Sequence, residues 1–550
     1  MNYAQDALQA RLRWQSPALA TTFLPGAAWA VAVLAFLGYA WMFRSFAVDF
    51  PNADDYSQLL AVPYYFAMER SFWDGVRYLA SLSIEHRIFT LRLAALVQAN
   101  YLGGMSFTGL MMFGATILGG TLALLVLHAP RTYRPYVAAI AAALFFAPVN
   151  YEAQFWATGA LQHFGVLGYA FAALACIRRG GVAPAILGTL FGVAAAFTSA
   201  NGLMVFPAAA IMLWIAGRRA ESLLFAVIGV ALFGGYFVGY DPAQATGSRL
   251  DAITRPFALA RFGLIAIGSV AAYTPGALLV GAGVVAAWCW LLARYRDVPA
   301  LLLGWTCFLG LSYAAMAVGR LEFGDGGALL SRYRVYSEAL IVVTLIALLH
   351  VARERLRVAL LAAGATAAVA WFGISAHLLT PYIAHASISH ETSRAHFLAT
   401  GHGIYDRFPP QEYGDFLLGR ARALGYFRPS TPPDPPVSVT TKAPTVVAPS
   451  PLVIERLTLR TNSVTVRGFA PAGATQPVLW LDDGTRRYRA PLHTYPGIDT
   501  PFGAEWGFVW GTVTVSGEPS RRFRIGYGVQ NDSLQDVVYW TDAWLPDGGH

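Results

Sequence analysis

The sequence predicts a multi-pass α-helical membrane protein that carries a C-terminal all-β domain. Three observations lead to this fold class. First, 56% of the 550 residues are hydrophobic, 13% are charged and the mean hydropathy is +0.48, which is far more apolar than a soluble globular chain. Second, apolar runs of about 15 to 23 residues recur between short polar breaks, and a helix of this length crosses a bilayer. Third, apolar and polar residues alternate in the last part of the chain, as they do in strands.

The apolar runs predict about eleven membrane-spanning helices. They lie near 27–46, 106–127, 136–150, 159–177, 182–198, 203–217, 222–240, 276–293, 298–318, 335–350 and 357–379. Clusters of arginine follow alternate spans, and the positive-inside rule makes that side cytoplasmic. The apolar stretch 257–272 is predicted to be a re-entrant or interfacial helix, because a twelfth span would put the later arginines on the wrong side.

The chain is predicted to divide into consecutive parts. Residues 1–26 are a cytoplasmic N-terminus, and 27–379 form the transmembrane domain with a large first outer loop over 47–105. A membrane-proximal helical segment follows over 380–428, then a stiff Pro-rich linker over 429–451 and a β-sandwich domain over 452–550. Frequent Arg, Ala and Gly with a single lysine, Lys442, are typical of a GC-rich bacterial genome. We therefore expect a bacterial inner membrane, with the segments after 380 in the periplasm.

Composition also limits the classes of partner. The net charge is +8, but arginines that orient membrane helices account for such a bias, and no basic helix or repeat of the usual nucleic-acid modules occurs. The chain is therefore predicted to bind membrane lipids and no nucleic acid. Cys176, Cys289 and Cys307 all lie in apolar stretches and are predicted to be packing residues. The oligomeric state does not follow from the sequence.

Two adjacent carboxylates, Asp54 and Asp55, follow the first span by a few residues. Acids are costly inside the bilayer, but just beyond its surface they can take a proton or bind a metal ion. We predict both as catalytic residues, with a divalent cation, Mg²⁺ or Mn²⁺, as an optional ligand of the pair. The alternative is that Asp54 only caps a helix over 56–66 that lies along the membrane surface.

Charged residues at two other places on the outer side could share this chemistry. Glu85, His86 and Arg87 combine an acid, an imidazole and a cation within one turn, and they are predicted to position a substrate. The alternative is that they only anchor the chain at the lipid headgroups.

Arg320, Arg332 and Arg334 flank a glycine-rich loop late in the membrane domain, where they oppose the positive-inside bias. Guanidinium groups match phosphate oxygens in a bidentate way, so this loop is predicted to bind phosphate. Pairing with Glu322, Asp325 or lipid headgroups is the alternative.

The outer break 150–156 places hydrogen-bonding groups beside aromatic rings. Gln154 and Trp156 are predicted to position a sugar, whose hydroxyls need polar partners and whose C–H faces stack on rings. An ordinary aromatic belt at the membrane surface explains the same residues.

These features together resemble the GT-C superfamily of glycosyltransferases that use polyprenyl-phosphate sugars, over roughly residues 27–430. The resemblance lies in Asp54-Asp55-Tyr56 after the first span, Glu85-His86-Arg87, Ser331-Arg332-Tyr333 before a late span, and an appended outer β domain. It implies a transfer of sugar from a polyprenyl-phosphate donor to a glycan or glycolipid acceptor, with inversion at the anomeric carbon. Asp54 or Asp55 would be the general base, and which of the two is left open.

The same resemblance implies that Arg332, with Arg334 or Arg320, holds the departing lipid phosphate, while Glu85, His86 and Arg87 position acceptor or phosphate. Three other functions remain open. A polymerase or ligase of pyrophosphate-linked glycans would depend on late arginines and a histidine rather than on the early acid pair. A transporter or flippase of lipid-linked sugars would show charged or helix-breaking residues near the midplane and repeated halves. A surface-glycan receptor would use the β domain, whose Trp480, Trp506, Trp510, Trp540 and Trp544 either stack on glycan or fill its core.

Overall fold

A computed structural model gives the fold. It describes residues 18–68, 71–83, 85–240, 252–295, 297–401, 403 and 410–429, and the strands and adjoining residues of the C-terminal region at 438–440, 445–447, 452–460, 463–471, 477–482, 487–495, 506–514, 524–530 and 536–544. The chain divides into two compact units, of which the first holds residues 1–45, 77–91 and 111–376 and the second holds 46–76, 92–110 and 377–550. The predicted first loop, 47–105, is thus shared between the units. Much of the predicted linker and the residue Arg296 lie outside the described residues.

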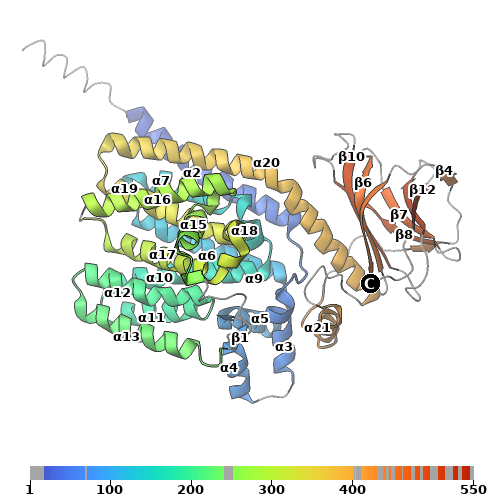
Figure 1. The fold of residues 1–550 in the computed structure, drawn as a ribbon, viewed down its shortest axis with the longest axis horizontal. Coiled ribbons are helices and arrows are strands. Elements are labelled where there is room, and N and C mark those ends of the chain that lie inside the picture. The colour runs from blue at the N-terminus through green and yellow to red at the C-terminus, as the bar shows by residue number, and fades with distance from the viewer. Residues whose placement is uncertain are drawn as a thin grey trace, which may run out of the picture. The chain divides into compact units, whose positions relative to one another are not determined.

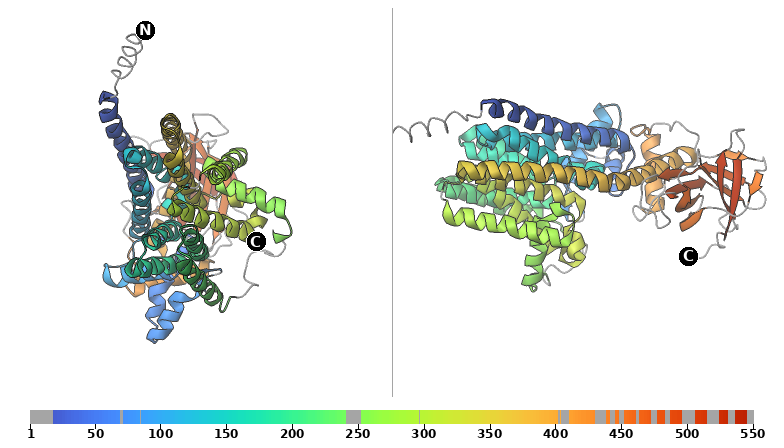
Figure 2. Two further views of the ribbon diagram at one scale, coloured as in Figure 1. Left: turned by 90° about the vertical axis from the view of Figure 1, so that its left-hand side faces the viewer. Right: turned by 90° about the horizontal axis from the view of Figure 1, so that it is seen from above.

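Helices dominate the first unit, and its long helices run side by side in a bundle (Figures 1 and 2). The α-helices of the first unit, long and short, are α2 (Ala18–Phe46), α6 (Phe107–His128), α7 (Arg134–Phe145), α8 (Tyr151–Gln154), α9 (Ala157–Gly159), α10 (Gly165–Arg179), α11 (Val182–Ala196), α12 (Val205–Ile215), α13 (Arg219–Tyr236), α15 (Pro256–Ile267), α16 (Thr274–Arg294), α17 (Ala300–Arg320), α18 (Gly324–Ala328), α19 (Arg334–Val351) and the start of α20 (Glu354–Thr400). Gly180 ends α10 with φ of 78°, a left-handed conformation that favours glycine.

In the described part of the chain, eight helices are long and apolar enough to cross a membrane. A ninth span results if the pair Arg131–Phe145 and Pro148–Gln154, bent by 46°, counts as one. The two other predicted spans fall on α11 and α12, which have 15 and 11 residues. The stretch predicted to be re-entrant or interfacial contains the short apolar helix α15.

Large apolar side chains on these helices point outward, which identifies the medium. Leu34 is 65% exposed, Leu223 67%, Val230 75% and Leu279 77%. Monomeric soluble proteins rarely expose such apolar surface, whereas lipid tails are as apolar as leucine. The helices therefore form a membrane domain. Of the three free cysteines, Cys289 is exposed on α16, so its prediction as a packing residue was wrong.

The centre of the bundle is held by helix packing around aromatic rings. Here α10 packs against α11, α12 and α17, while α19 packs against α7 and α17. Trp305 of α17 is fully buried, stacks on Phe171 of α10 at 4.8 Å and donates its indole N–H to the Phe171 carbonyl at 3.1 Å. This contact satisfies the one polar group of the indole inside an apolar core.

In the second unit, the chain after the first span folds against the helix α21 (Gln411–Ala423). A single π-helical turn (Tyr56–Leu60) leads into α3 (Ala61–Phe66), and both pack on α21. The hydroxyl of Tyr426 donates to the carbonyl of Leu60 at 2.9 Å, and the Tyr426 carbonyl accepts from the N–H of Met105. Leu59, Leu60 and Val62 are fully buried. The apolar face of 56–66 is therefore packed inside this unit.

Short elements connect the two units along the chain. The helix α4 (Phe72–Ala80) precedes a hairpin of β1 (Leu82–Ser83) and β2 (His86–Arg87), and α5 (Phe89–Tyr101) follows it. Helix α20 continues without a break from the first unit into the second, over Pro381.

The C-terminal strands form two sheets. One has the order β5-β6-β10-β9, and the other β3-β8-β7-β11-β12-β4. Their bounds are β3 (Ser438–Thr440), β4 (Thr445–Val447), β5 (Val453–Arg460), β6 (Ser463–Pro471), β7 (Pro477–Asp482), β8 (Arg487–Pro491), β9 (His493–Tyr495), β10 (Trp506–Thr514), β11 (Arg524–Gln530) and β12 (Asp536–Trp544). All pairs are antiparallel except β12 with β4.

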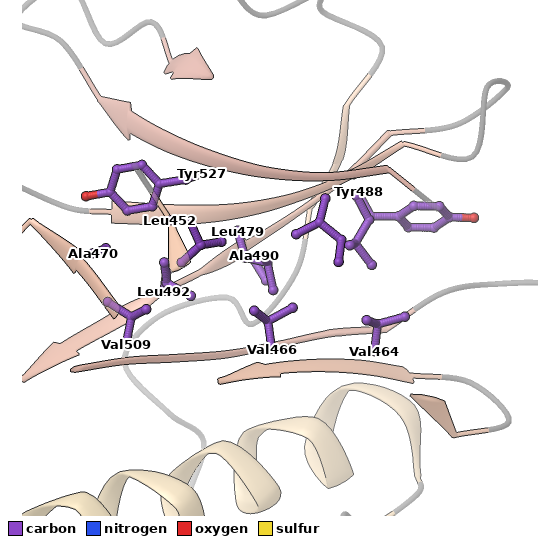
Figure 3. Packing of buried hydrophobic residues seen from close by; sticks show 12 residues of the cluster. Leu452, Val464, Val466, Ala470, Leu479, Tyr488, Ala490, Leu492, Val509 and Tyr527 are labelled. Carbon is purple, nitrogen blue, oxygen red and sulfur yellow. The ribbon is translucent and has the colours of Figure 1, made fainter. Parts of the chain in front are cut away.

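One buried core joins the two sheets (Figure 3). It combines Val464, Val466 and Val509 of the first sheet with Leu479, Leu481, Tyr488, Ile525 and Tyr527 of the second. Strands β3 and β4 come from the segment predicted to be a linker, so parts of 429–451 belong to the larger sheet. Trp480 is 2% exposed and packs with Val478, so it fills the domain rather than binding glycan. The side chains of Trp506, Trp510, Trp540 and Trp544 lie outside the described ones.

Candidate functional site

At one end of the first unit, four segments far apart in the sequence meet. They are the hairpin β1–β2, the break between α7 and α10, the 3₁₀ turn Ala200–Met204 and the loop between α17 and α19. The break forms because Pro148 begins a 3₁₀ turn (Pro148–Asn150) after α7 has ended. Gly202 lets the turn approach α11, since a Cβ there would lie 2.1 Å from the backbone of Ala195.

Arg320 and Glu85 form an ion pair at this end. Arg320 donates through Nη2 to Glu85 Oε1 at 2.8 Å, and the side chains are 27% and 13% exposed. The guanidinium also lies over the ring of Phe323 at 5.6 Å. The sequence predicted both residues as site residues, and the structure brings them into contact.

Arg332 and Glu152 form the second ion pair. The guanidinium Nη1 lies 3.5 Å from Glu152 Oε2, and the same oxygen accepts the backbone N–H of Arg332 at 3.2 Å. The Arg332 guanidinium lies over the rings of Trp156 and Tyr333, at 5.9 and 5.3 Å. Trp156, predicted to position a sugar, is therefore placed beside a cation that can bind an anion.

His163 contacts Tyr333 and Tyr336 and was not among the predicted site residues. The charges of Arg332, Arg320 and His86 all act on its imidazole. Its Nδ1 is 3.2 Å from the hydroxyl of Tyr336, and its ring meets that of Tyr333 edge to face at 5.3 Å. His163 belongs to a π-helical turn (Ala160–Phe164), a distortion of the α-helix that is frequent at functional sites.

The 3₁₀ turn Ala200–Met204, which follows α11, also contacts residues of the site. The sequence alone did not predict a role for this turn. The N–H of Ala200 donates to His86 Nδ1 at 3.3 Å, and Gln162 donates to Ser199 Oγ at 3.2 Å. The hydroxyl of Tyr336 hydrogen-bonds the side chain of Asn201. His86 is thus brought to the site as predicted, through a backbone contact.

Three predicted site residues hold the backbone instead of facing the site. Arg87 donates to the carbonyls of Ala80, Tyr236 and Val238. Arg334 donates to the carbonyls of Leu329 and Val149, and Gln154 to those of Phe145 and Ala147. These donors satisfy carbonyl groups that the broken helix and the loops leave without partners.

A buried polar pair lies beneath the site. The Asn150 amide donates to Glu338 Oε2 at 2.8 Å, and both residues are 0% exposed. Asn150 Oδ1, Gln154 Oε1 and Glu338 Oε1 are buried and have no hydrogen-bond partner. The pair ties the break after α7 to α19 one turn after Arg334.

Asp54 and Asp55 belong to the second unit. Asp55 is 0% exposed, and its Oδ2 accepts the N–H of Asn52 at 3.1 Å, while its own N–H donates to the Asn52 carbonyl. Asp54 is partly exposed. Ala53 has φ of 45°, a left-handed conformation that is costly for a residue with a Cβ. Local strain of this kind clusters at functional sites, and the π-helical turn from Tyr56 follows directly.

The described residues do not form an evident binding site for the predicted divalent cation. Among the described residues, no group of three or more His, Cys, Asp or Glu side chains could hold a metal ion. One oxygen of Asp55 is already engaged by the Asn52 backbone. Asp54 and Asp55 therefore do not fit a divalent cation by themselves.

No family model matches the chain, and no curated protein or solved structure is significantly similar to it. The function must therefore be argued from the site itself. An arginine on aromatic rings, a second arginine, a histidine and two carboxylates at one end of a membrane domain can bind an anionic group. The rings beside them can bind an apolar face of the same ligand.

Proposed function

We propose that the protein is a membrane glycosyltransferase that moves a sugar from a polyprenyl-phosphate donor to a glycan or glycolipid acceptor. One observation carries this proposal: Arg332, Arg320, His163 and Trp156 gather at one end of a membrane domain. A lipid-linked donor keeps its phosphate at the membrane surface, where this cluster would meet it. The resemblance of the sequence to the GT-C superfamily points the same way.

In the proposed reaction, the acceptor hydroxyl attacks the anomeric carbon of the donor sugar. An aspartate takes the hydroxyl proton, the bond between the anomeric carbon and the phosphate oxygen breaks, and the lipid phosphate leaves with the electron pair. Arg332 and Arg320 stabilise the charge that develops on this phosphate. The attack on the face opposite the leaving group inverts the anomeric carbon.

We assign the base to Asp54 rather than Asp55. Asp55 closes the turn with Asn52 and is fully buried, whereas Asp54 is partly exposed. A general base must reach the proton that it removes, so the exposed carboxylate is the better candidate. The strained Ala53 beside it would set its direction.

The proposal includes a membrane topology with more spans than the eight long apolar helices. The proposal counts the bent pair and the two short helices α11 and α12 as spans, which makes eleven, and the positive-inside rule would then put the site end of the first unit outside the cytoplasm. In a bacterial inner membrane that side is the periplasm, where lipid-linked sugars rather than nucleotide sugars are the expected donors. The C-terminal strands would then form a periplasmic β-sandwich that holds the acceptor glycan.

Sugar transfer in proteoliposomes tests the proposal. Labelled polyprenyl-phosphate sugars are supplied with crude acceptor glycan to the wild type, Asp54→Asn, Asp55→Asn and Arg332→Ala. Consumption of one donor by the wild type and not by a folded Asp54→Asn supports the proposal. If the wild type consumes none of a broad panel, or if both aspartate variants retain full activity, the proposal is wrong.

His163 favours a second candidate, a polymerase or ligase that uses pyrophosphate-linked glycans. Such an enzyme depends on arginines and a histidine, which is the composition of the cluster in the first unit. The two candidates differ in the donor: the second requires a pyrophosphate-linked oligosaccharide and tolerates Asp54→Asn. Supplying both donor types in the same assay separates them.

A further inference from the structure

Glu152 contacts the start of the span Ser331–Val351 in two different ways. Its backbone N–H donates to Ser331 Oγ at 3.0 Å, and its Oε2 accepts the N–H of Arg332 at 3.2 Å. Its contact with the Arg332 guanidinium is 3.5 Å, at the long limit of a hydrogen bond. Glu152 is therefore hydrogen-bonded to the start of this span, whereas its ion pair with the Arg332 guanidinium is long.

The two ion pairs of the site differ in a consistent way. The pair of Glu85 with Arg320 is 2.8 Å long, and Glu85 is 13% exposed. In the pair of Glu152 with Arg332 the distance is 3.5 Å, and both side chains are about one quarter exposed, at 25% and 26%. An accessible, long ion pair contributes little and can exchange its anion.

Arg332 does not depend on Glu152 for its orientation. Its guanidinium lies over the rings of Trp156 and Tyr333, which support it from the sides. Gly159 allows Trp156 this position, because a Cβ at residue 159 would lie 3.0 Å from the indole ring. An anion that replaced the Glu152 carboxylate would therefore meet a guanidinium already in place.

We propose that Glu152 is the resident anion of a phosphate site at Arg332, and that the phosphate of the lipid donor displaces its carboxylate on binding. This inference rests on the proposed function, since it names the contact that the donor must break. A phosphate accepts two parallel hydrogen bonds from a guanidinium and carries more charge than a carboxylate, so it wins the exchange. After transfer the carboxylate returns and competes with the lipid-phosphate product, which speeds its release.

Glu152→Gln isolates this role. The amide oxygen still accepts the Arg332 N–H, so the loop keeps its backbone contact, while the competing charge is lost. We expect the variant to bind a soluble probe, farnesyl phosphate, about two- to fivefold more tightly than the wild type, which is the range of an accessible ion pair. Binding is measured on the full chain in phosphatidylcholine nanodiscs. Glu354→Gln is the matched control, because Glu354 pairs with Arg357 at the same 3.5 Å outside this cluster.

Two further probes identify the source of the phosphate. Inorganic phosphate and phosphatidylglycerol should compete with farnesyl phosphate weakly, and competition by phosphatidylglycerol as strong as that of the probe would overturn a donor site in favour of ordinary lipid. Unchanged or weaker binding of farnesyl phosphate to Glu152→Gln overturns the inference, even when sugar transfer is active. If farnesyl phosphate binds neither protein, the inference fails, and the transfer assay then decides separately whether the proposed function fails with it.

Discussion

Arg320 donates a hydrogen bond to Glu85 at 2.8 Å across 235 residues of sequence. Glu85 lies in the turn of the β1–β2 hairpin, and Arg320 ends α17, where a cation is favoured by the helix dipole. The contact stabilises a hairpin whose strands have two residues each and which would be too short to be stable alone. His86 of the same hairpin accepts the N–H of Ala200 at 3.3 Å.

This pair should be measurable as a coupling free energy. Arg320→Ala leaves the largely buried Glu85 carboxylate without its cation, and we expect it to lower the free energy of unfolding by about 1–2 kcal/mol, between the values for exposed and buried pairs. Glu85→Gln should cost less, because the amide still accepts a hydrogen bond. Unfolding of the two single variants and the double variant in detergent gives the coupling, and strict additivity would show that the contact contributes nothing.

The membrane domain could be predicted from the sequence because apolar length decides it. Each predicted span falls on a helix, although the run at 136–150 is broken at Pro148, and α11 and α12 are short. Contacts such as Glu85 with Arg320 could not be predicted, since nothing local in the sequence specifies a partner 235 residues away. The polar pair Gln162-His163 inside an apolar run was a visible signal for His163. An isolated histidine in such a run is more often a packed residue, and the π-helical turn that presents it leaves no mark in the sequence.

The backbone contacts of Arg87, Arg334 and Gln154 could not be predicted, for a related physical reason. A sequence shows that a charged or polar side chain lies at the membrane edge, but not whether a bent backbone leaves carbonyl groups there. The break after α7 and the end of α13 do leave such groups, and these three side chains satisfy them. Arg320 and Arg332 differ because carboxylates, rather than carbonyls, lie beside them.

Asp54→Asn and Asp55→Ala should separate chemistry from folding. If Asp54 is the base, Asp54→Asn lowers the turnover number about 10²- to 10⁴-fold, the usual contribution of general base catalysis. Its melting temperature should stay close to that of the wild type. Asp55→Ala should instead lower the melting temperature, because the partly buried N–H of Asn52 loses its acceptor. Transfer activity of each purified variant, beside its thermal unfolding, is the measurement. The reverse pattern would make Asp55 the base.

The buried pair of Asn150 with Glu338 should tolerate Glu338→Gln but not Asn150→Ala. Glu338→Gln keeps an oxygen for the Asn150 amide, so we expect little change in stability. Asn150→Ala removes the partner of a buried carboxylate oxygen and should cost about 1–3 kcal/mol of unfolding free energy. Unfolding in detergent measures both, with Thr116→Ala on the exposed side of α6 as a control, since its hydroxyl bonds only its own helix. A large loss in Glu338→Gln would mean that the charge itself is required there.

Arg87→Ala and Arg332→Ala should fail in different ways, although both remove an arginine from the same end of the first unit. Arg87 donates to two carbonyls at the end of α13 and to that of Ala80 at the end of α4, which holds the β1–β2 hairpin to both helices, so its loss should lower the melting temperature. Donor affinity in the protein that remains folded should change little. Arg332 lies over two rings and forms a long ion pair with a partly exposed carboxylate, so its loss should lower the melting temperature less than the loss of Arg87 and weaken binding of farnesyl phosphate at least tenfold, the loss of a charge-assisted hydrogen bond of about 1.5–3 kcal/mol. Thermal unfolding and probe binding on the same preparations separate the two effects, and equal loss of binding in both variants would place Arg87 at the phosphate after all.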